Sequence, residues 1–398
     1  MVTPDALYAA PNALATHYSR FRVAERLLLT GHSHQAWPDR GFAGQQRAWL
    51  DAAEYVDDKW ERAFAQADAV RRGFARLLDD PGGAIALGAS THELVVRFLS
   101  ALPLRRRPRL VTTDGEFHTI RRQFDRLAEE GEGVEVVKVA ALPAATAAER
   151  LAGALDGRTA AVLVSAVLYE NAHIVPNLGP LLAACERVGA ELLVDAYHAL
   201  NVVPLSLARE RLERAYVVGG GYKYCQLGEG NCFLHIPRDC ALRPVVTGWF
   251  SEFDALAAAP AGTVSYGPGP ARFAGATYDP TSHYRAAEVF AFFDEQGLTP
   301  ELLRDVSQHQ VGLMARGFDD LNADPGVITR DRAVPLPSVG GFLALRSPRA
   351  GDLCHRLRGR GVLTDFRGDV LRLGPAPYLS DAQLEAAVGI LGEVARDA

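Results

Sequence analysis

GGGYKYCQLGEGN, residues 219–231, carries one lysine, Lys223, between Tyr222 and Tyr224 and directly after the apolar run AYVVGG. A lysine at the end of a buried strand is costly to desolvate unless charge partners or covalent chemistry use it. Imine chemistry is one such use, because it needs an amine whose pKa has been lowered. The same residues fit an ordinary surface lysine in a loop that closes an α/β unit equally well, so the rest of the chain has to distinguish the two hypotheses.

The composition is typical of a soluble globular protein. Hydrophobic residues make up 48% and charged residues 23% of the 398 positions. A chain of this length favours one large domain with a smaller one beside it. The net charge of −6 argues against a nucleic-acid binder, which usually presents a basic face.

Targeting, membrane and metal signals are weak. No apolar run reaches the roughly 20 residues of a membrane helix, and the N-terminus lacks a basic start followed by an apolar block. The five cysteines form no CxxC pair, which argues against a disulfide framework or structural zinc. His32 and His34 alternate, but without nearby acidic or cysteine ligands they fit a loop near an active site better than a metal pair. We therefore predict a cytoplasmic protein with no metal and no nucleic-acid or membrane partner.

Short apolar runs alternate with helical patterns over residues 84–240. Such alternation predicts a mostly parallel sheet covered by helices on both faces. A Walker motif and a GxGxxG between strand and helix are both missing, which disfavours the nucleotide-binding folds. The predicted strands are 84–88, 109–113, 160–171, the apolar run before Asp195, the run before Lys223, and the segment NCFLHIP.

Polar residues follow several of these strands. Ser90 or Thr91 can cap the helix that begins there, and the same helix start can bind a phosphate. Phe117 lies just past a strand end, where ligand sites of open α/β sheets collect. Asp195 ends an apolar strand, so its carboxylate must be paired, either as a structural cap or with a cationic ring nitrogen.

The chain after Pro244 is rich in glycine and proline, and a second α/β unit follows it. This second unit has helical patterns at about 283–317, 351–361 and from 380 onward. Near the N-terminus, a further helical pattern covers residues 41–79 and is broken near Asp57. We predict an N-terminal arm and helix that join the small domain at 1–60, a large domain at 61–282, and a small C-terminal domain at 283–398.

Asp195, Lys223 and the Ser90-Thr91 helix start are together the parts that pyridoxal 5'-phosphate (PLP) requires. This cofactor needs a lysine for an imine bond, a carboxylate for its pyridine nitrogen and a helix N-terminus for its phosphate. The two strand-end residues are 28 positions apart (223 − 195), enough for one connection and one strand.

Four motifs in order, VDAYHALNVVPL (194–205), GYKY (221–224), TGWF (247–250) and VLRLGPAPYLS (370–380), resemble those of a known family. The chain resembles a fold type I PLP enzyme of the class V aminotransferase group and is most similar to kynureninases. The resemblance covers about residues 25–395. It implies a homodimer with an active site shared between subunits.

The resemblance also implies roles for individual residues. Lys223 would bind the cofactor and move the substrate Cα proton, Asp195 would bind the pyridine nitrogen, and Arg372 would bind the substrate α-carboxylate. Tyr222 would reach the phosphate and is also implied as a proton donor. The further cofactor-binding residues implied are Ser90, Thr91, Phe117, Thr119, His198, Trp249 and, from the neighbouring subunit, Thr277.

Several positions depart from the kynureninase pattern. GHSHQ (31–35) stands where kynureninases have GNSLG, and YVDDKWER (55–62) lacks their ring-binding histidine. Tyr278 or Asp279 replaces an asparagine, and a Ser-Asp phosphate contact is reduced to Thr119. The cofactor residues are mostly kept and the substrate pocket is not.

Three hypotheses follow. The first is a kynureninase-like hydrolase that cleaves the Cβ–Cγ bond of an L-kynurenine-type amino acid to alanine and an aromatic acid. The second is another class V enzyme: an aminotransferase, a desulfurase, a lyase or an epimerase. A desulfurase is disfavoured because residues 320–345 hold no cysteine. The third is a non-catalytic PLP-binding protein, against which the presence of both Lys223 and Arg372 weighs.

Overall fold

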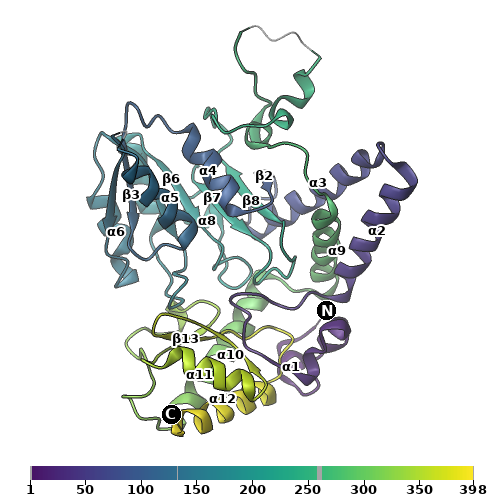
Figure 1. Cartoon of the computed structure of the whole chain (residues 1–398), viewed down its shortest axis with the longest axis vertical. Helices are drawn as coiled ribbons and strands as arrows, with labels where there is room; N and C mark the ends of the chain where they lie inside the picture. The colour runs from purple at the N-terminus through teal and green to yellow at the C-terminus, as the bar shows by residue number, and fades with distance from the viewer. Residues whose placement is uncertain (1, 132, 258–261, 398) are drawn as a thin grey trace.

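A seven-stranded sheet forms the centre of the larger part of the computed structural model, which describes residues 2–131, 133–257 and 262–397. The strand order is β2-β8-β7-β6-β5-β3-β4, and β8 alone runs antiparallel to its neighbours. Helices cover both faces, and a smaller C-terminal unit lies below (Figure 1), so the predicted fold class is confirmed. The strands are β2 Ala84–Gly88, β3 Arg109–Thr113, β4 Glu135–Val139, β5 Thr159–Ser165, β6 Glu191–Asp195, β7 Tyr216–Gly220 and β8 Cys232–Ile236.

The central strands are apolar on both faces, which explains the two helical layers. In β6, Leu192 and Val194 belong to one buried cluster and Leu193 to the other. Because successive side chains of a strand point to opposite faces, such a strand must be covered on both sides. Phe74 and Leu181 come from the helices of the first layer, and the second layer is built on α4 and α5.

Most of the predicted helices are present. The break expected near Asp57 separates α2 from α3, and both helices pack against α9. The helices are α1 Pro4–Tyr8, α2 Asp39–Tyr55, α3 Lys59–Leu77, α4 Thr91–Ala101, α5 His118–Glu129, α6 Ala147–Gly153, α7 Leu178–Val188, α8 Leu207–Glu210, α9 Thr281–Gln296, α10 Pro300–Asp320, α11 Ala350–Gly359 and α12 Asp381–Arg396. Short 3-10 segments cover Ala15–Phe21, Val23–Glu25, Ala144–Thr146, Trp249–Ala255, Gly269–Phe273 and Leu336–Ser338.

The strand predicted over 160–171 was too long, because β5 ends at Ser165. The Ala166 N–H donates to the Asp195 carbonyl at 2.9 Å, and Val167 then forms an isolated bridge with Ile174. The chain therefore leaves the sheet at the level of Asp195 and turns towards the C-terminal unit.

The C-terminal unit contains a four-stranded antiparallel sheet of order β12-β13-β10-β9, built from Asp365–Arg367, Val370–Leu373, Leu343–Arg346 and Thr329–Arg330. The N-terminal segment joins it, because β1 (Leu27–Leu28) pairs in parallel with β11 (Val362–Leu363). The division at 60 and 282 stays a prediction.

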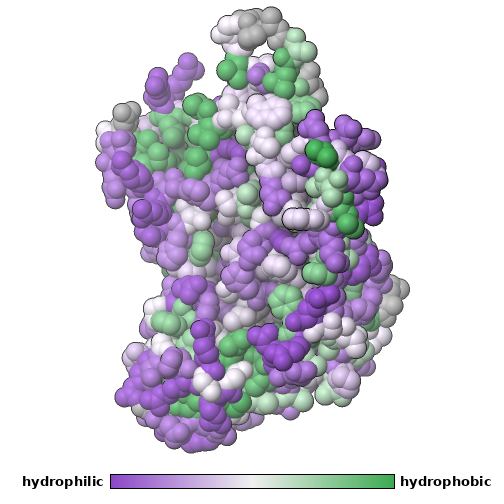
Figure 2. All heavy atoms as spheres, turned by 45° about the vertical axis from the view of Figure 1, so that its right-hand side comes forward, coloured by the Kyte–Doolittle hydropathy of each residue, from purple (hydrophilic) through white to green (hydrophobic). Residues whose placement is uncertain are grey.

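The segment after β8 projects from the top of the molecule and carries hydrophobic side chains there (Figures 1 and 2). Its exposed apolar residues include Val245, Trp249, Phe253 and Val264. Of the helices that the structure describes, none is long and apolar enough to cross a membrane. The described residues also contain no cluster of three or more His, Cys, Asp or Glu side chains that could hold a metal ion.

Candidate active site

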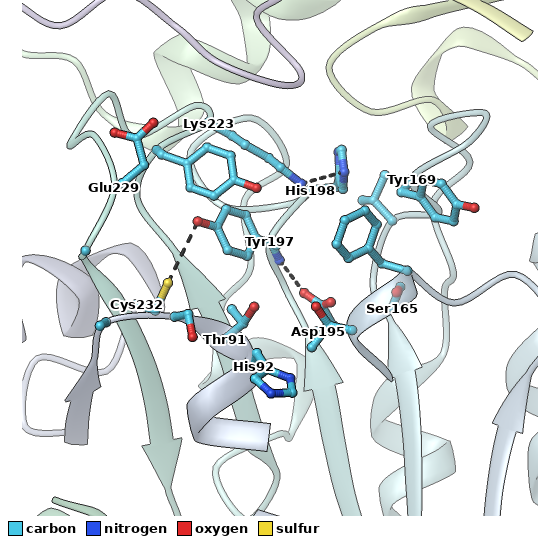
Figure 3. Close-up of a pocket in the computed structure, with 17 residues that line it drawn as sticks. Thr91, His92, Ser165, Tyr169, Asp195, Tyr197, His198, Lys223, Glu229 and Cys232 are labelled. Atoms are coloured by element: carbon cyan, nitrogen blue, oxygen red, sulfur yellow. Dashed lines mark hydrogen bonds between the residues drawn. The ribbon is translucent and has the colours of Figure 1, made fainter. Parts of the chain in front are cut away.

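A cavity of about 340 Å³ lies at the carboxyl ends of β5 and β6, beside the start of α4 (Figure 3). Eight of the eleven residues predicted for the site line it. Ligands of open α/β sheets bind at this edge, where polar groups at strand ends meet helix N-termini. The eight are Ser90, Thr91, Phe117, Thr119, Asp195, His198, Tyr222 and Lys223.

Lys223 is 5% exposed and reaches into this cavity from the loop after β7. Burial lowers the pKa of its amine to about 7, although the charge of Asp195 acts in the opposite direction. Its Nζ lies 2.7 Å from His198 Nε2. Burial, and then the charge of Lys223, keep the pKa of His198 well below its usual value, so the imidazole is neutral and Nε2 accepts from the amine. Lys223 is therefore a buried amine that is half neutral near pH 7.

Asp195 is the last residue of β6 and lines the lower side of the cavity in Figure 3. The Tyr197 N–H donates to Oδ1 at 2.8 Å. Burial raises the pKa of this carboxyl, while that N–H and the Lys223 charge oppose the shift. A cationic ring nitrogen placed in the cavity would give the carboxylate a charge partner.

The start of α4 meets the cavity through Ser90, Thr91 and His92. Ser90 has extended backbone angles and its Oγ accepts from the Glu93 N–H at 3.2 Å, so the capping role predicted for it is present. The first-turn N–H groups and the positive end of the helix dipole also face the cavity, a combination that suits a phosphate.

Arg372 does not line the cavity, but it contacts a residue that does. It is 3% exposed and its Nη1 donates to the carbonyl of Tyr169, a lining residue, at 2.7 Å. Its Nε and Nη2 donate to Asp365 Oδ1 and Oδ2 at 2.9 and 2.6 Å. Three of the five guanidinium N–H groups are thus used, and one N–H on each of Nη1 and Nη2 remains for a carboxylate.

Asp365 was not predicted from the sequence, and His32 holds it from the other side. His32 is fully buried and its Nε2 lies 2.7 Å from Asp365 Oδ1. Burial lowers the pKa of His32 to about 4, so the neutral ring donates this hydrogen bond. Although burial opposes it, His32 and Arg372 hold the pKa of Asp365 well below its usual range. The GHSHQ loop therefore lies against the active site, as its sequence suggested.

Known proteins are similar to this chain in sequence. Residues 331–391 match the kynureninase C-terminal domain. The chain is 23% identical over 421 residues to a kynureninase of Geobacillus thermodenitrificans, covering 99% of this chain and 89% of that protein. It is 22% identical to the uncharacterized aminotransferase YcbU of Bacillus subtilis over 85% of this chain and 87% of that protein. With a Bacillus cereus kynureninase it shares 25% identity, but over only 56% of that protein.

Solved structures share the fold. A C-DES mutant with glycine covalently linked to the PLP cofactor superposes with a TM-score of 0.81 at 16% identity, covering 95% of this chain and 98% of that one. The cysteine desulfurase CsdA of Escherichia coli gives 0.78 at 14% identity, covering 99% and 98%. The chain therefore has the fold of these structures, and its sequence is similar to kynureninases.

Besides Arg372, two predicted residues lie outside the cavity. Trp249 is 43% exposed and packs on Phe250 and Phe253 in the projecting segment. Thr277 lines a separate cavity of about 1040 Å³, which shares Ala89, Glu229 and Gly230 with the first. Within one chain neither residue reaches Lys223, so their contact with a phosphate stays a prediction.

Several residues that line the cavity were not singled out from the sequence. Tyr197, two residues after Asp195, and Cys232, the first residue of β8, could have been found from their places at strand ends. Behind the lining, Glu116 is buried and accepts from Thr113 Oγ1 and Ser165 Oγ at 2.7 and 2.6 Å. Burial raises the pKa of Glu116 to about 7. The other lining residues are Ala89, His92, Ser165, Val167, Tyr169, Glu229 and Gly230.

Proposed function

We propose that this protein binds PLP through Lys223. The observation that carries the proposal is a buried lysine with a pKa of about 7, held by a neutral histidine above a buried carboxylate. The residues fit the cofactor: the α4 start suits its phosphate, Asp195 its ring nitrogen and Lys223 its aldehyde. Phe117, whose ring centre lies 5.5 Å from Lys223 Nζ, suits one face of the ring. When bound, PLP supplies an electron sink for the negative charge that develops at the substrate Cα.

The residues then divide the work. Lys223 forms the covalent bond and, once displaced by the substrate amine, takes the Cα proton, because about half of its amine is neutral near pH 7. Asp195 stabilises the protonated pyridine nitrogen, and Arg372 orients the α-carboxylate with its Nη1–Nη2 edge. His198 accepts a hydrogen bond from Lys223 and fixes where the amine points.

We further propose that the reaction is hydrolysis of the Cβ–Cγ bond of an L-kynurenine-type amino acid. Water adds at the γ-carbonyl, the Cβ–Cγ bond breaks, and the products are alanine and an aromatic acid. The match to the kynureninase C-terminal domain supports this proposal, since it includes both Asp365 and Arg372. The nearly full-length alignment with a kynureninase supports it as well.

A second proposal is amino transfer, which the alignment with YcbU over 85% of this chain favours. Sulfur transfer has less support, although the superposed structures include a desulfurase. The cavity does contain a thiol, Cys232, but burial raises its pKa to about 12, so it is not a thiolate at neutral pH.

Incubation with L-kynurenine and with 3-hydroxy-L-kynurenine tests the hydrolase. The expected result is anthranilate-type fluorescence together with alanine, in the PLP-loaded wild type and not in Lys223→Ala. Amino transfer would instead consume the amino acid only with a keto-acid acceptor and would release no anthranilate-type acid. If neither kynurenine is turned over while PLP is still bound, the substrate proposal is wrong and the cofactor proposal stands.

We also propose that two chains assemble as a homodimer that shares its active sites. The apolar side chains of the projecting segment, among them Val245, Phe253 and Val264, are exposed in one chain (Figure 2). Exposed apolar patches of this kind mark protein interfaces. Light scattering of the PLP-loaded protein tests the assembly. A cytoplasmic location stays a prediction.

A further inference from the structure

Tyr197 is the most prominent lining residue to which the proposed function gives no role. It is 7% exposed, and its backbone N–H binds the Asp195 carboxylate. Its ring centre lies 4.5 Å from Lys223 Nζ, closer than that of Phe117 at 5.5 Å. The ring projects into the middle of the cavity above Asp195 (Figure 3). Asp195, which is expected to bind the pyridine nitrogen, therefore also holds the backbone of Tyr197 and so the aromatic ring next to the Lys223 amine.

The hydroxyl of Tyr197 points towards Cys232, at the end of the cavity where α4 begins (Figure 3). It lies 3.8 Å from Cys232 Sγ, a weak hydrogen-bond partner (Figure 3). The Cys232 thiol in turn lies at the backbone N–H of Thr91, the first residue of α4. Burial raises the pKa of Tyr197 well above its usual value, so the hydroxyl keeps its proton. A buried O–H donor thus converges with the helix start that suits an anion.

We propose that Tyr197 is a PLP-binding residue with two contacts: its ring packs on the cofactor ring from the side that Phe117 leaves open, and its hydroxyl donates to the phosphate. The inference rests on the proposed PLP binding. A hydrogen bond from a phenol O–H to an anion is stronger than one to a thiol. Phosphate binding would therefore give the buried Tyr197 hydroxyl a better acceptor than Cys232.

Comparing PLP with pyridoxal separates the two contacts, because pyridoxal has the same ring and aldehyde but no phosphate. Apoprotein is titrated with each compound, and binding is followed by absorbance and by borohydride trapping on Lys223. Tyr197→Phe removes only the hydroxyl and should weaken PLP binding roughly ten-fold while leaving pyridoxal binding unchanged. Tyr197→Ala removes the ring as well and should weaken both. Inorganic phosphate should compete with PLP less well in Tyr197→Phe than in wild type.

Tyr224→Phe is the matched control, because it removes a buried phenol next to Lys223 that lies outside the cavity lining. Both affinities should be unchanged in this variant, and thermal melts show whether each variant is folded. An equal PLP-to-pyridoxal affinity ratio in wild type and Tyr197→Phe overturns the phosphate contact. Unchanged pyridoxal binding in a folded Tyr197→Ala overturns the ring contact. If borohydride traps neither compound on Lys223 of the wild type, the proposed PLP binding is wrong, and this inference is wrong with it.

Discussion

The pKa of Lys223 makes a quantitative prediction about how the apoprotein reacts with aldehydes. The shift from 10.5 to about 7 corresponds to about 5 kcal/mol between the two protonation states. At pH 7 about half of the amine is neutral, whereas an ordinary lysine is neutral in roughly one molecule of 3,000. Attachment of pyridoxal to Lys223 should therefore be fast at neutral pH, and its rate should level off above a midpoint near pH 7.

The chain offers its own reference groups for this measurement. It contains only three lysines, Lys59, Lys138 and Lys223. Borohydride trapping after short exposures at pH 6–10, followed by peptide mass spectrometry, gives the rate at each lysine in one sample. Modification at neutral pH should concentrate on Lys223.

Charge changes around Lys223 should move this midpoint in opposite directions. Burial is the main cause of the low pKa, Asp195 raises it and Arg372 lowers it. Asp195→Asn should therefore lower the midpoint and Arg372→Gln should raise it, each on the order of half a unit. A wild-type midpoint near 10, or shifts of the same sign in both variants, would refute the reasoning.

Three further predictions concern the supports of the site. Asp365→Asn leaves the buried charge of Arg372 without its anion and should lower the free energy of unfolding by about 3 kcal/mol in urea titrations, and should raise KM for the amino acid more than it lowers kcat. His32 has a folded pKa of about 4 against 6.5 when unfolded, so its contribution is present above pH 6.5 and is lost as pH falls towards 4. This group should make the free energy of unfolding about 2 kcal/mol lower at pH 5 than at pH 7. The variant His32→Gln should remove this difference, whereas the control His34→Gln, at an exposed histidine, should keep it. Ser90→Ala removes the cap of α4 and should lower the free energy of unfolding by about 1 kcal/mol in urea titrations.

The parts of the site that lie at strand ends could be predicted from the sequence. Asp195 and the Ser90 helix start each follow an apolar run of strand length, and carboxyl ends of parallel strands share one sheet edge. Lys223 follows such a run too, by a short loop. Periodicity therefore placed these three residues near one another without any knowledge of their contacts. It did not place the end of β5, because residues 166–168 continue the apolar run of the strand. The backbone hydrogen bonds that turn the chain there, such as the one from the Leu168 N–H to the His173 carbonyl, have no periodic signal in the sequence.

The support behind Arg372 could not be predicted in the same way. His32 and Asp365 are 333 positions apart and meet because β1 and β11, two residues each, pair in parallel. A strand of two residues has no period to detect. Tyr197 was in view within the motif around Asp195, but the direction of its ring depends on the backbone turn that the Asp195 carboxylate holds.

The charges around Lys223 explain why a neutral amine and a buried guanidinium can coexist in so small a space. Two neighbouring histidines, His32 and His198, are both neutral because burial lowers their pKa values. Neither therefore adds positive charge beside Lys223. Asp365 is ionised and bound to Arg372 on two of its nitrogens, which offsets the cation that would otherwise lower the amine pKa further. A further carboxyl group, Asp195, lines the same cavity, and a protonated pyridine bound there would give its carboxylate a charge partner. The same balance accounts for the opposite signs predicted for Asp195→Asn and Arg372→Gln.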